Sequence, residues 1–466
     1  MKAYELGTGF SATLASWAAT VSPRWPDATL QAAERGVVDT IACMISGVGD
    51  LAVQRVRQGL QTWGGAGPCS AVGLERGVDA PWAALINGTA AHALDYDDVL
   101  DPAASHVSAV LVPALLALAD ETGASGAEVL DAYIVGVEVQ ECLAEAVNMA
   151  HYTRGWHTTL TLGAPSAAAA CARLLKLDPV LTRNAMSLAT SMSGGFKRQF
   201  GTQAKPFHAG LGAKNGLLAA RLAACGLTAD PQPFEGARGF FDLMVDSGAK
   251  GFQEEISRLQ GPTAIEQPGL WLKRYPCCAS THRAVDALLH LMQAHRLQAS
   301  DFAHVDTWVS EAAVRNLMYD KPINEMQARF SMPYCLAAAA LDGDLTLSTF
   351  RERSLARSDI RSLMNIVSMH TDPDQPAHMP STIKNWALVT IETADGRRLS
   401  HRVRDPQGYP QCPLSEAELS RKYSDCAEGQ TSQIVDGFQT WRHLGTTSKT
   451  QLITTLLRGV RPLQVN

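Results

Sequence analysis

One stretch of the chain, residues 87–113 (NGTAAHALDYDDVLDPAASHVSAVLVP), concentrates side chains that can carry acid–base chemistry. Its six titratable groups are His92, Asp95, Asp97, Asp98, Asp101 and His106. Segments rich in Ala, Gly and Leu flank them on both sides, which is typical of closely packed helices. The pattern therefore favours a polar pocket set into a helical core. Spacing alone leaves open a helix end that runs into an acidic surface loop.

Two further histidines stand where a helix is expected to begin. His157 precedes the Ala-rich segment 163–175, and His282 opens the predicted helix 281–294. A histidine at a helix N-terminus is biased toward its neutral form, which can accept a proton. The alternative for each is a buried polar residue bonded to the backbone.

Lysine and arginine residues near proline supply candidate cations. Lys205 directly precedes Pro206 and is close to His208, and burial there would lower the pKa of its ammonium group. We expect His208 itself to support packing. Lys273 and Arg274 offer cations for substrate carboxylates, to which arginine binds in a bidentate manner. Solvated surface charge is the alternative for all three cations.

The acidic cluster also admits a metal site, because carboxylate oxygens bind hard cations. Neither His92 nor His106 has the i, i+4 partner that helical metal pairs use, so we expect no metal. Nucleophile elbows, Walker loops and HExxH patterns are absent, and the ten cysteines include no Cys-x-x-Cys pair.

The elements that must position these groups are mainly helical up to about residue 265. Apolar residues recur at helical spacing from Leu30 to Gly47, and Ser125 opens a capping box with Glu128. The spacing of apolar residues changes near Pro268, after which predicted helices mix with segments of β-like alternation. A hairpin is predicted at 386–403 around an Asp395-Gly396 turn, and helices return after Pro406. The sequence predicts a helical domain and a smaller mixed domain.

The composition and charge of the chain limit the kinds of partner that it can bind. The net charge of −6 and pI of about 6.1 offer no basic field to nucleic acid or to an anionic membrane. The apolar runs are shorter than the roughly 20 residues that span a bilayer, and no signal peptide is recognisable. We expect a soluble cytoplasmic protein without nucleic-acid or membrane partners.

Five segments resemble the MmgE/PrpD family in order and spacing: NGTAAHALDYDD, SHVSAVLVPALLALA, GWHTTLTLGAPSAAAA, TQAKPFHAGLGAKNG and KRYPCCASTHRAVDAL. The resemblance implies a mainly α fold, with a large all-helical domain from both ends of the chain (1–267 and 404–466) and a smaller α+β lid (268–403). It also implies a homodimer and cofactor-free acid–base chemistry on small polycarboxylates.

The same resemblance implies roles for particular residues. The family's catalytic positions match Asp95, His106, His157, Lys205 and His282. The residues that we expect to bind the substrate are Lys273, Arg274, Tyr275 and Asp98.

Departures from the family motifs bear on the reaction. Dehydratases of the family usually read D-x-N-D, whereas Asp97 replaces the Asn here; decarboxylases usually have a Thr where Val99 stands and a Pro where Val107 stands. Neither subfamily fits cleanly. All family reactions share proton transfer at a carbon α to a carboxylate, and an epimerase needs only that step.

We therefore expect an epimerase resembling iminodisuccinate epimerase, in which two of His106, His157, His282 and Lys205 exchange a proton with the α-carbon and Asp95 orients a histidine. Three alternatives stay open. The first is a lyase of the same family, a 2-methylcitrate dehydratase or cis-aconitate decarboxylase. The others are a metal-dependent lyase and a non-catalytic helical dimer that binds a small acid.

Overall fold

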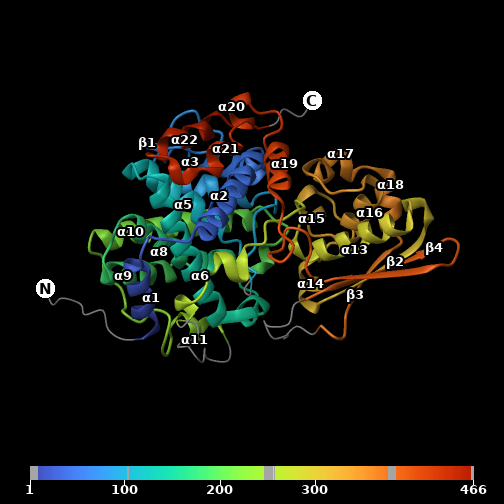
Figure 1. The fold of residues 1–466 in the computed structure, drawn as a ribbon, viewed down its shortest axis with the longest axis horizontal. Helices are drawn as coiled ribbons and strands as arrows, with labels where there is room; N and C mark the ends of the chain where they lie inside the picture. Colours follow the sequence, from blue (N-terminus) through green and yellow to red (C-terminus); the bar gives the residue numbers. More distant parts are fainter. Residues whose placement is uncertain are drawn as a thin grey trace.

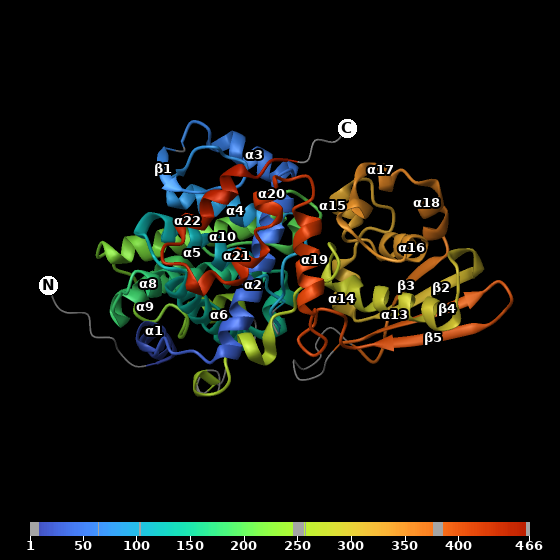
Figure 2. The same ribbon diagram turned by 45° about the horizontal axis from the view of Figure 1, so that its top comes forward.

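The computed structural model describes residues 9–63, 65–101, 104–245, 256, 258–375 and 385–462. Two groups of elements lie side by side, a larger helical body and a smaller α/β unit (Figure 1). The C-terminal helices leave the α/β unit and return to the body beside α2 (Figure 2). Both ends of the chain therefore contribute to the helical body.

The helical body contains α1 (Phe10–Thr20), α2 (Asp27–Gly47), α3 (Leu51–Leu60), β1 (Ala66–Cys69), α4 (Ala80–His92), α5 (Ser108–Thr122), α6 (Gly126–Arg154), α7 (Thr158–Thr161), α8 (Gly163–Leu174), α9 (Pro179–Thr190), the 3₁₀ turn η1 (Lys197–Gln199), α10 (Ala204–Ala224) and α11 (Phe240–Met244). The C-terminal part adds α19 (Glu416–Cys426), α20 (Ser432–Val435), α21 (Phe438–Arg442) and α22 (Gln451–Thr454). The capping box predicted at Ser125 and Glu128 is confirmed at the start of α6.

Close helix packing brings the two halves of the site together. A Cβ atom on Gly210 in α10 would lie 2.3 Å from the backbone oxygen of Leu85 in α4, and one on Gly88 would lie 2.9 Å from the Cα of Gly210. Only glycine permits α4 and α10 to approach this closely. The approach places the end of α4 beside the first turn of α10, which carries Lys205.

The α/β unit contains α13 (Ala279–His295), β2 (Phe302–Val309), α14 (Glu311–Asn316), α15 (Glu325–Ala328), α16 (Met332–Asp342), α17 (Glu352–Leu355), α18 (Ser358–Met364), β3 (Val367–Thr371), β4 (Ala387–Thr393) and β5 (Arg398–Val403). Its sheet has the order β3-β2-β4-β5, with β2 and β3 parallel and the other pairs antiparallel. The predicted hairpin is confirmed, since Ala387 pairs with Val403 and Gly396 has a φ of 87°.

Two large hydrophobic cores correspond to these groups. One is built from residues between Ala33 and Leu272 together with residues from Leu414 to Val460, and the other from residues between Tyr275 and Ile391. Phe200 of the body belongs to the second core, so it lies at the junction of the two groups. The boundaries at 268 and 403 stay a prediction.

No single described helix is long and apolar enough to cross a membrane. By length and composition only α2 and α3 would qualify, and only as a pair that is bent by 81°.

Candidate functional site

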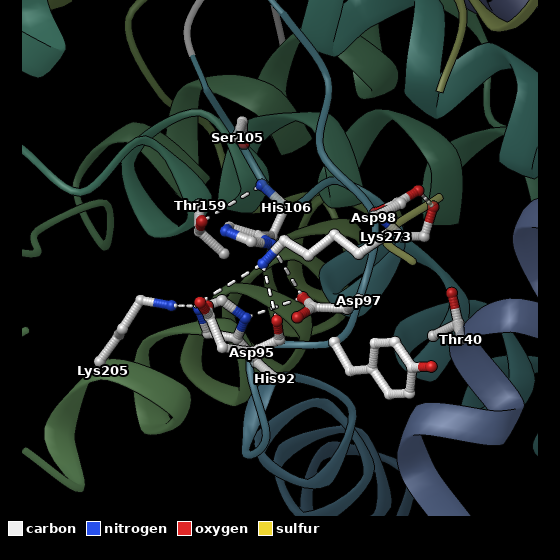
Figure 3. Close-up of polar contacts among 12 residues, drawn as sticks. Thr40, His92, Asp95, Asp97, Asp98, Ser105, His106, Thr159, Lys205 and Lys273 are labelled. Carbon is white, nitrogen blue, oxygen red and sulfur yellow. Dashed lines mark hydrogen bonds and ion pairs between the residues drawn. The ribbon is translucent and has the colours of Figure 1, made fainter. Parts of the chain in front are cut away.

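The loop between α4 and α5 turns at Asp95, whose φ of 54° lies in the left-handed region that aspartate tolerates better than most residues. The Asp95 carboxylate is paired with the Lys205 ammonium group through Oδ1. Lys273 Nζ lies 3.4 Å from Oδ2 and donates a hydrogen bond of 2.8 Å to the Asp95 backbone oxygen. One aspartate therefore joins α4, α10 and the segment before α13 at a single buried point (Figure 3).

The Asp95 carboxyl group and the Lys273 amino group are both charged at neutral pH. Burial favours the neutral acid, but the ammonium groups of Lys205 and Lys273 outweigh it and hold the pKa of Asp95 well below its usual range. Burial likewise favours neutral Lys273, yet the Asp95 carboxylate raises the pKa of this lysine above its usual value. The site therefore holds fixed ammonium groups of the kind that bind carboxylates.

A second carboxylate, Asp97, lies between two imidazoles. Its Oδ2 is 2.7 Å from His92 Nδ1 and 3.2 Å from His106 Nδ1, and the two rings pack with centroids 4.4 Å apart. The His106 backbone N–H donates to Thr159 Oγ1 at 3.3 Å, which fixes the chain next to the ring. Asp97 can therefore stabilise a positive charge on His106 during proton transfer.

The imidazole of His157 adjoins this pair, with its ring centroid 5.7 Å from that of His92. Its Nδ1 lies 2.9 Å from Nδ1 of His208, so one of the two nitrogens carries the proton and the other accepts it. His157 Nε2 is buried and has no hydrogen-bond partner within the described part of the chain. The tautomer of His157 is therefore linked to that of His208, which we expected only to support packing.

All four imidazoles are held neutral. Burial lowers the pKa of His92 to about 3 and that of His208 to about 4, and it also lowers the pKa of His106 and of His157. Neutral rings beside two ammonium groups form a site that can accept and return a proton.

The structure directs Arg274 away from this cluster. Its guanidinium is 3.0 Å from Asp344 Oδ2, and its backbone oxygen accepts a hydrogen bond from the Tyr96 hydroxyl at 3.1 Å. Of the Lys-Arg pair, Lys273 therefore reaches Asp95 and Arg274 reaches Asp344. Arg274 instead lines a pocket with residues of α19, among them Glu418 and Arg421.

His282 and Tyr275 also face the α/β unit. The Tyr275 hydroxyl donates to Asp286 Oδ1 at 2.6 Å, and His282 packs its ring against Trp271 and Tyr275. The Nε2 of His282 lies 3.3 Å from the backbone oxygen of Cys277. These contacts support the segment that carries Lys273 and do not join the cluster around Asp95.

Asp98 contacts the start of α5 and not the cluster around Asp95. Its carboxylate accepts hydrogen bonds from the Ser108 hydroxyl and from the Ser108 backbone N–H, the latter at 3.2 Å. Burial raises the pKa of Asp98 to about 7. Its contacts hold α5 in place, so the structure provides no support for the expectation that Asp98 binds substrate.

Four of these groups could also surround a metal ion. Ligand atoms of His92, Asp95, Asp97 and His106 all lie within 4.8 Å of one another. The oxygens of Asp95 already face Lys205 and Lys273, and two ammonium groups at this distance repel a divalent cation. The donor set therefore fits a metal poorly.

Sequence reasoning missed the roles of Asp97, His92 and His208. The first two stood in the acidic stretch, but a role for Asp97 required knowing that His92 at the end of α4 and His106 before α5 face it from two sides. His208 lies one helical turn after Lys205, a spacing that places both side chains on one face of α10.

The known proteins similar to this chain include several cis-aconitate decarboxylases. Cis-aconitate decarboxylase from Homo sapiens is 29% identical over 400 residues, which cover 82% of this chain and 80% of that protein. Cis-aconitate decarboxylase from Aspergillus terreus is 26% identical over 452 residues, which cover 91% of each.

Family models match most of the chain. The MmgE/PrpD N-terminal domain matches residues 12–253, and the MmgE/PrpD C-terminal domain matches residues 275–436. The resemblance seen in the sequence motifs is confirmed, and the chain belongs to the MmgE/PrpD family.

Proposed function

We propose that this protein is a cofactor-independent acid–base lyase that releases CO₂ from cis-aconitate or a closely similar unsaturated tricarboxylate. The observation that carries the proposal is the buried cluster in which neutral His106 and His157 adjoin the ammonium groups of Lys205 and Lys273. The similarity to cis-aconitate decarboxylases gives the substrate class. Those relatives favour the lyase over the epimerase that the motifs suggested.

The reaction needs one proton and a place for negative charge. CO₂ leaves from the methylene carbon of the substrate, and the electron pair of the broken bond forms a new C=C bond to the central carbon. The former double bond takes up a proton at its other end. Lys205 and Lys273 would bind carboxylates of the substrate and stabilise the charge that spreads onto them in the transition state.

We assign the proton donor as His106. It is more exposed than His92 and His157, at 8% against 1% for each of those two. Burial keeps its pKa low in the free protein, but a bound polyanion favours the imidazolium form, which Asp97 also stabilises. His157 would hydrogen-bond the substrate through its unpartnered Nε2.

Proton NMR in D₂O tests the assignment. Cis-aconitate, iminodisuccinate and 2-methylcitrate are offered separately, and we expect CO₂ release and one deuterium per product molecule from cis-aconitate alone. Deuterium exchange into iminodisuccinate without loss of mass would instead establish an epimerase. Tight binding of all three acids without turnover would establish a binding protein.

We further propose a homodimer, as the family resemblance implies. Light scattering should then give a mass of about twice the 49.9 kDa of one chain. A mass equal to that of one chain at micromolar concentration would contradict it.

A further inference from the structure

A lysine outside the cluster lies at the contact between the helical body and the α/β unit. Lys197 begins the 3₁₀ turn η1, and its ammonium group stands 3.6 Å from the centroid of the Tyr152 ring, at the end of α6. From the α/β unit, the Cys278 thiol and the Arg315 guanidinium are within electrostatic range. Lys197 is therefore held between the two groups of elements.

The backbone fixes the position of Lys197 relative to His157, the histidine that we propose to hydrogen-bond the substrate. Residues 195–197 run alongside residues 155–157: the His157 N–H donates to the Gly195 oxygen at 2.9 Å, and the Lys197 N–H donates to the Gly155 oxygen at 2.8 Å. A bridge between Trp156 and Phe196 completes the pairing. These paired backbone segments hold Lys197 and His157 in a fixed position relative to each other.

One polar side chain interacts electrostatically with both Lys197 and the cluster. The Cys278 thiol is within electrostatic range of Asp95 and Lys273 as well as of Lys197. It is also hydrogen-bonded to Ser280, whose hydroxyl accepts a hydrogen bond of 3.3 Å from Asn316 Nδ2.

Tyr152 also interacts with both Lys197 and the cluster around Asp95. Its hydroxyl is hydrogen-bonded to Asn316, it is within electrostatic range of Asp95, and its ring contacts Lys197.

Charge balance distinguishes Lys197 from the cations around the cluster. In the cluster, the ammonium groups of Lys205 and Lys273 are offset by Asp95 and Asp97, and Arg274 is offset by Asp344. Among the residues that the structure describes, no carboxylate lies within ion-pair distance of Lys197. A substrate with three carboxylates needs a cation that is not already neutralised.

We propose that Lys197, with Tyr152 and Asn316, forms a second carboxylate subsite that binds the end of the substrate remote from the reacting carbon. This inference rests on the proposed function only in that the ligand is a polycarboxylate. Burial lowers the pKa of Lys197 to about 8, so the subsite is charged at neutral pH and loses its charge above that value. The titratable and charged groups around Lys197 are the Tyr152 phenol, the Cys278 thiol and the Arg315 guanidinium. Burial raises the pKa of the phenol and of the thiol above their usual values.

Calorimetric titration with propane-1,2,3-tricarboxylate, which lacks the reactive double bond, tests the subsite without relying on turnover. We expect Lys197→Met to weaken the Kd about tenfold or more, because a charge-assisted hydrogen bond is lost, and Lys197→Arg to restore most of it. Arg198→Met removes the neighbouring exposed charge on the same turn and should leave the Kd unchanged. For the wild type the affinity should fall above pH 8, and Lys197→Arg should abolish that fall.

A Kd within twofold of the wild type in Lys197→Met, an equal loss in Arg198→Met, or no binding of the tricarboxylate by the wild type would overturn the subsite. The lyase assignment is judged separately by CO₂ release from cis-aconitate. Lys197-dependent binding without CO₂ release would retain the subsite and remove that assignment. CO₂ release with unchanged binding by Lys197→Met would do the reverse.

Discussion

At the scale of single residues, the site depends on a few charges that are fixed by their neighbours. The Asp95 carboxylate is paired with two lysines, and the Asp97 carboxylate contacts two histidines. Each carboxylate sets the charge state of groups that come from other parts of the chain. Substitutions of these residues should therefore reduce activity more than they disturb the fold.

The first prediction concerns His157 and Lys205. Replacing His157 by Gln or Lys205 by Met should lower kcat by about 10²-fold or more, because a positioned acid–base or charge-stabilising group typically contributes roughly 10²–10⁴-fold. Turnover of cis-aconitate and circular dichroism are measured together. Lys214→Met is the matched control, since Lys214 lies on the same helix but contacts Trp82. Near-normal kcat in both site variants would contradict the acid–base model.

The second prediction is metal independence. Lys205 and Lys273 face the oxygens of Asp95, so a divalent cation would have to displace an ammonium group to bind there. Activity should survive dialysis against EDTA. Loss of activity that Mg²⁺, Mn²⁺ or Fe²⁺ restores would reassign His92, Asp95, Asp97 and His106 as ligands.

At the scale of elements, the helices that position the site pack so closely that an added Cβ atom would overlap the neighbouring helix. The close approach of α4 and α10 at Gly88 and Gly210 aligns the end of one helix with the start of the other. The same principle holds between α8 and α10. A Cβ atom on Gly216 would lie 2.4 Å from the Cβ of Ala167.

The third prediction follows from this packing. Gly216→Ala should destabilise the protein by about 1–3 kcal/mol, because the added methyl group forces two helices apart. Gly59→Ala is the control: Gly59 lies in α3 with nothing within 4 Å of an added Cβ, so helix propensity should make the change neutral or stabilising by up to about 1 kcal/mol. Urea unfolding monitored by circular dichroism measures both. Equal effects at the two sites would argue against tight packing of α8 and α10.

The fourth prediction concerns His151 at the end of α6. Its Nε2 is 2.7 Å from Thr161 Oγ1 and its Nδ1 is 3.2 Å from the Met244 oxygen, and burial lowers its pKa to about 4. The unfolded chain binds this proton near pH 6.5, so the stability contributed by the neutral ring is full above pH 6.5. It is lost as the pH falls toward 4, by about 3 kcal/mol in all.

Unfolding free energies at pH 7 and pH 4.5 for the wild type and His151→Gln test this. The glutamine variant cannot titrate in that range, so its stability should fall less between the two pH values than that of the wild type. An identical pH dependence for both proteins would show that the ring does not take part.

At the scale of the whole molecule, the two ends of the chain meet behind the site. Lys422 in α19 pairs with Asp39 in α2 at 2.7 Å, and its ammonium group also donates to the backbone oxygens of Tyr96 and Lys273. One buried cation thus connects the N-terminal and C-terminal helices to the loop of Asp95 and to the segment that enters the α/β unit. Folding of the body and assembly of the site are coupled through it.

The fifth prediction tests this coupling. Lys422→Met should destabilise the protein by about 3–5 kcal/mol, because it leaves the Asp39 carboxylate buried without its partner. The double variant with Asp39→Leu as well should recover most of that loss. Thermal and urea unfolding of the single and double variants give the coupling free energy. Additive losses would show that the two residues act independently.

Much of this protein follows from local sequence. Helical spacing, the capping box at Ser125 and the Asp395-Gly396 turn determine elements through interactions a few residues apart, and these predictions were confirmed. The motifs that carry Asp95, His106, His157 and Lys205 also identified the family, which the family models over residues 12–253 and 275–436 confirm.

Only the tertiary structure decided which charges meet. Lys273 and Arg274 are neighbours in the sequence, yet Lys273 reaches Asp95 and Arg274 reaches Asp344, two carboxylates that are far apart in the chain and that only tertiary packing brings to this segment. The pairing of His157 with His208 and the place of Lys197 likewise depend on contacts between segments that are distant in the chain. Electrostatic interactions act through space, and the sequence does not specify those distances until the helices have packed.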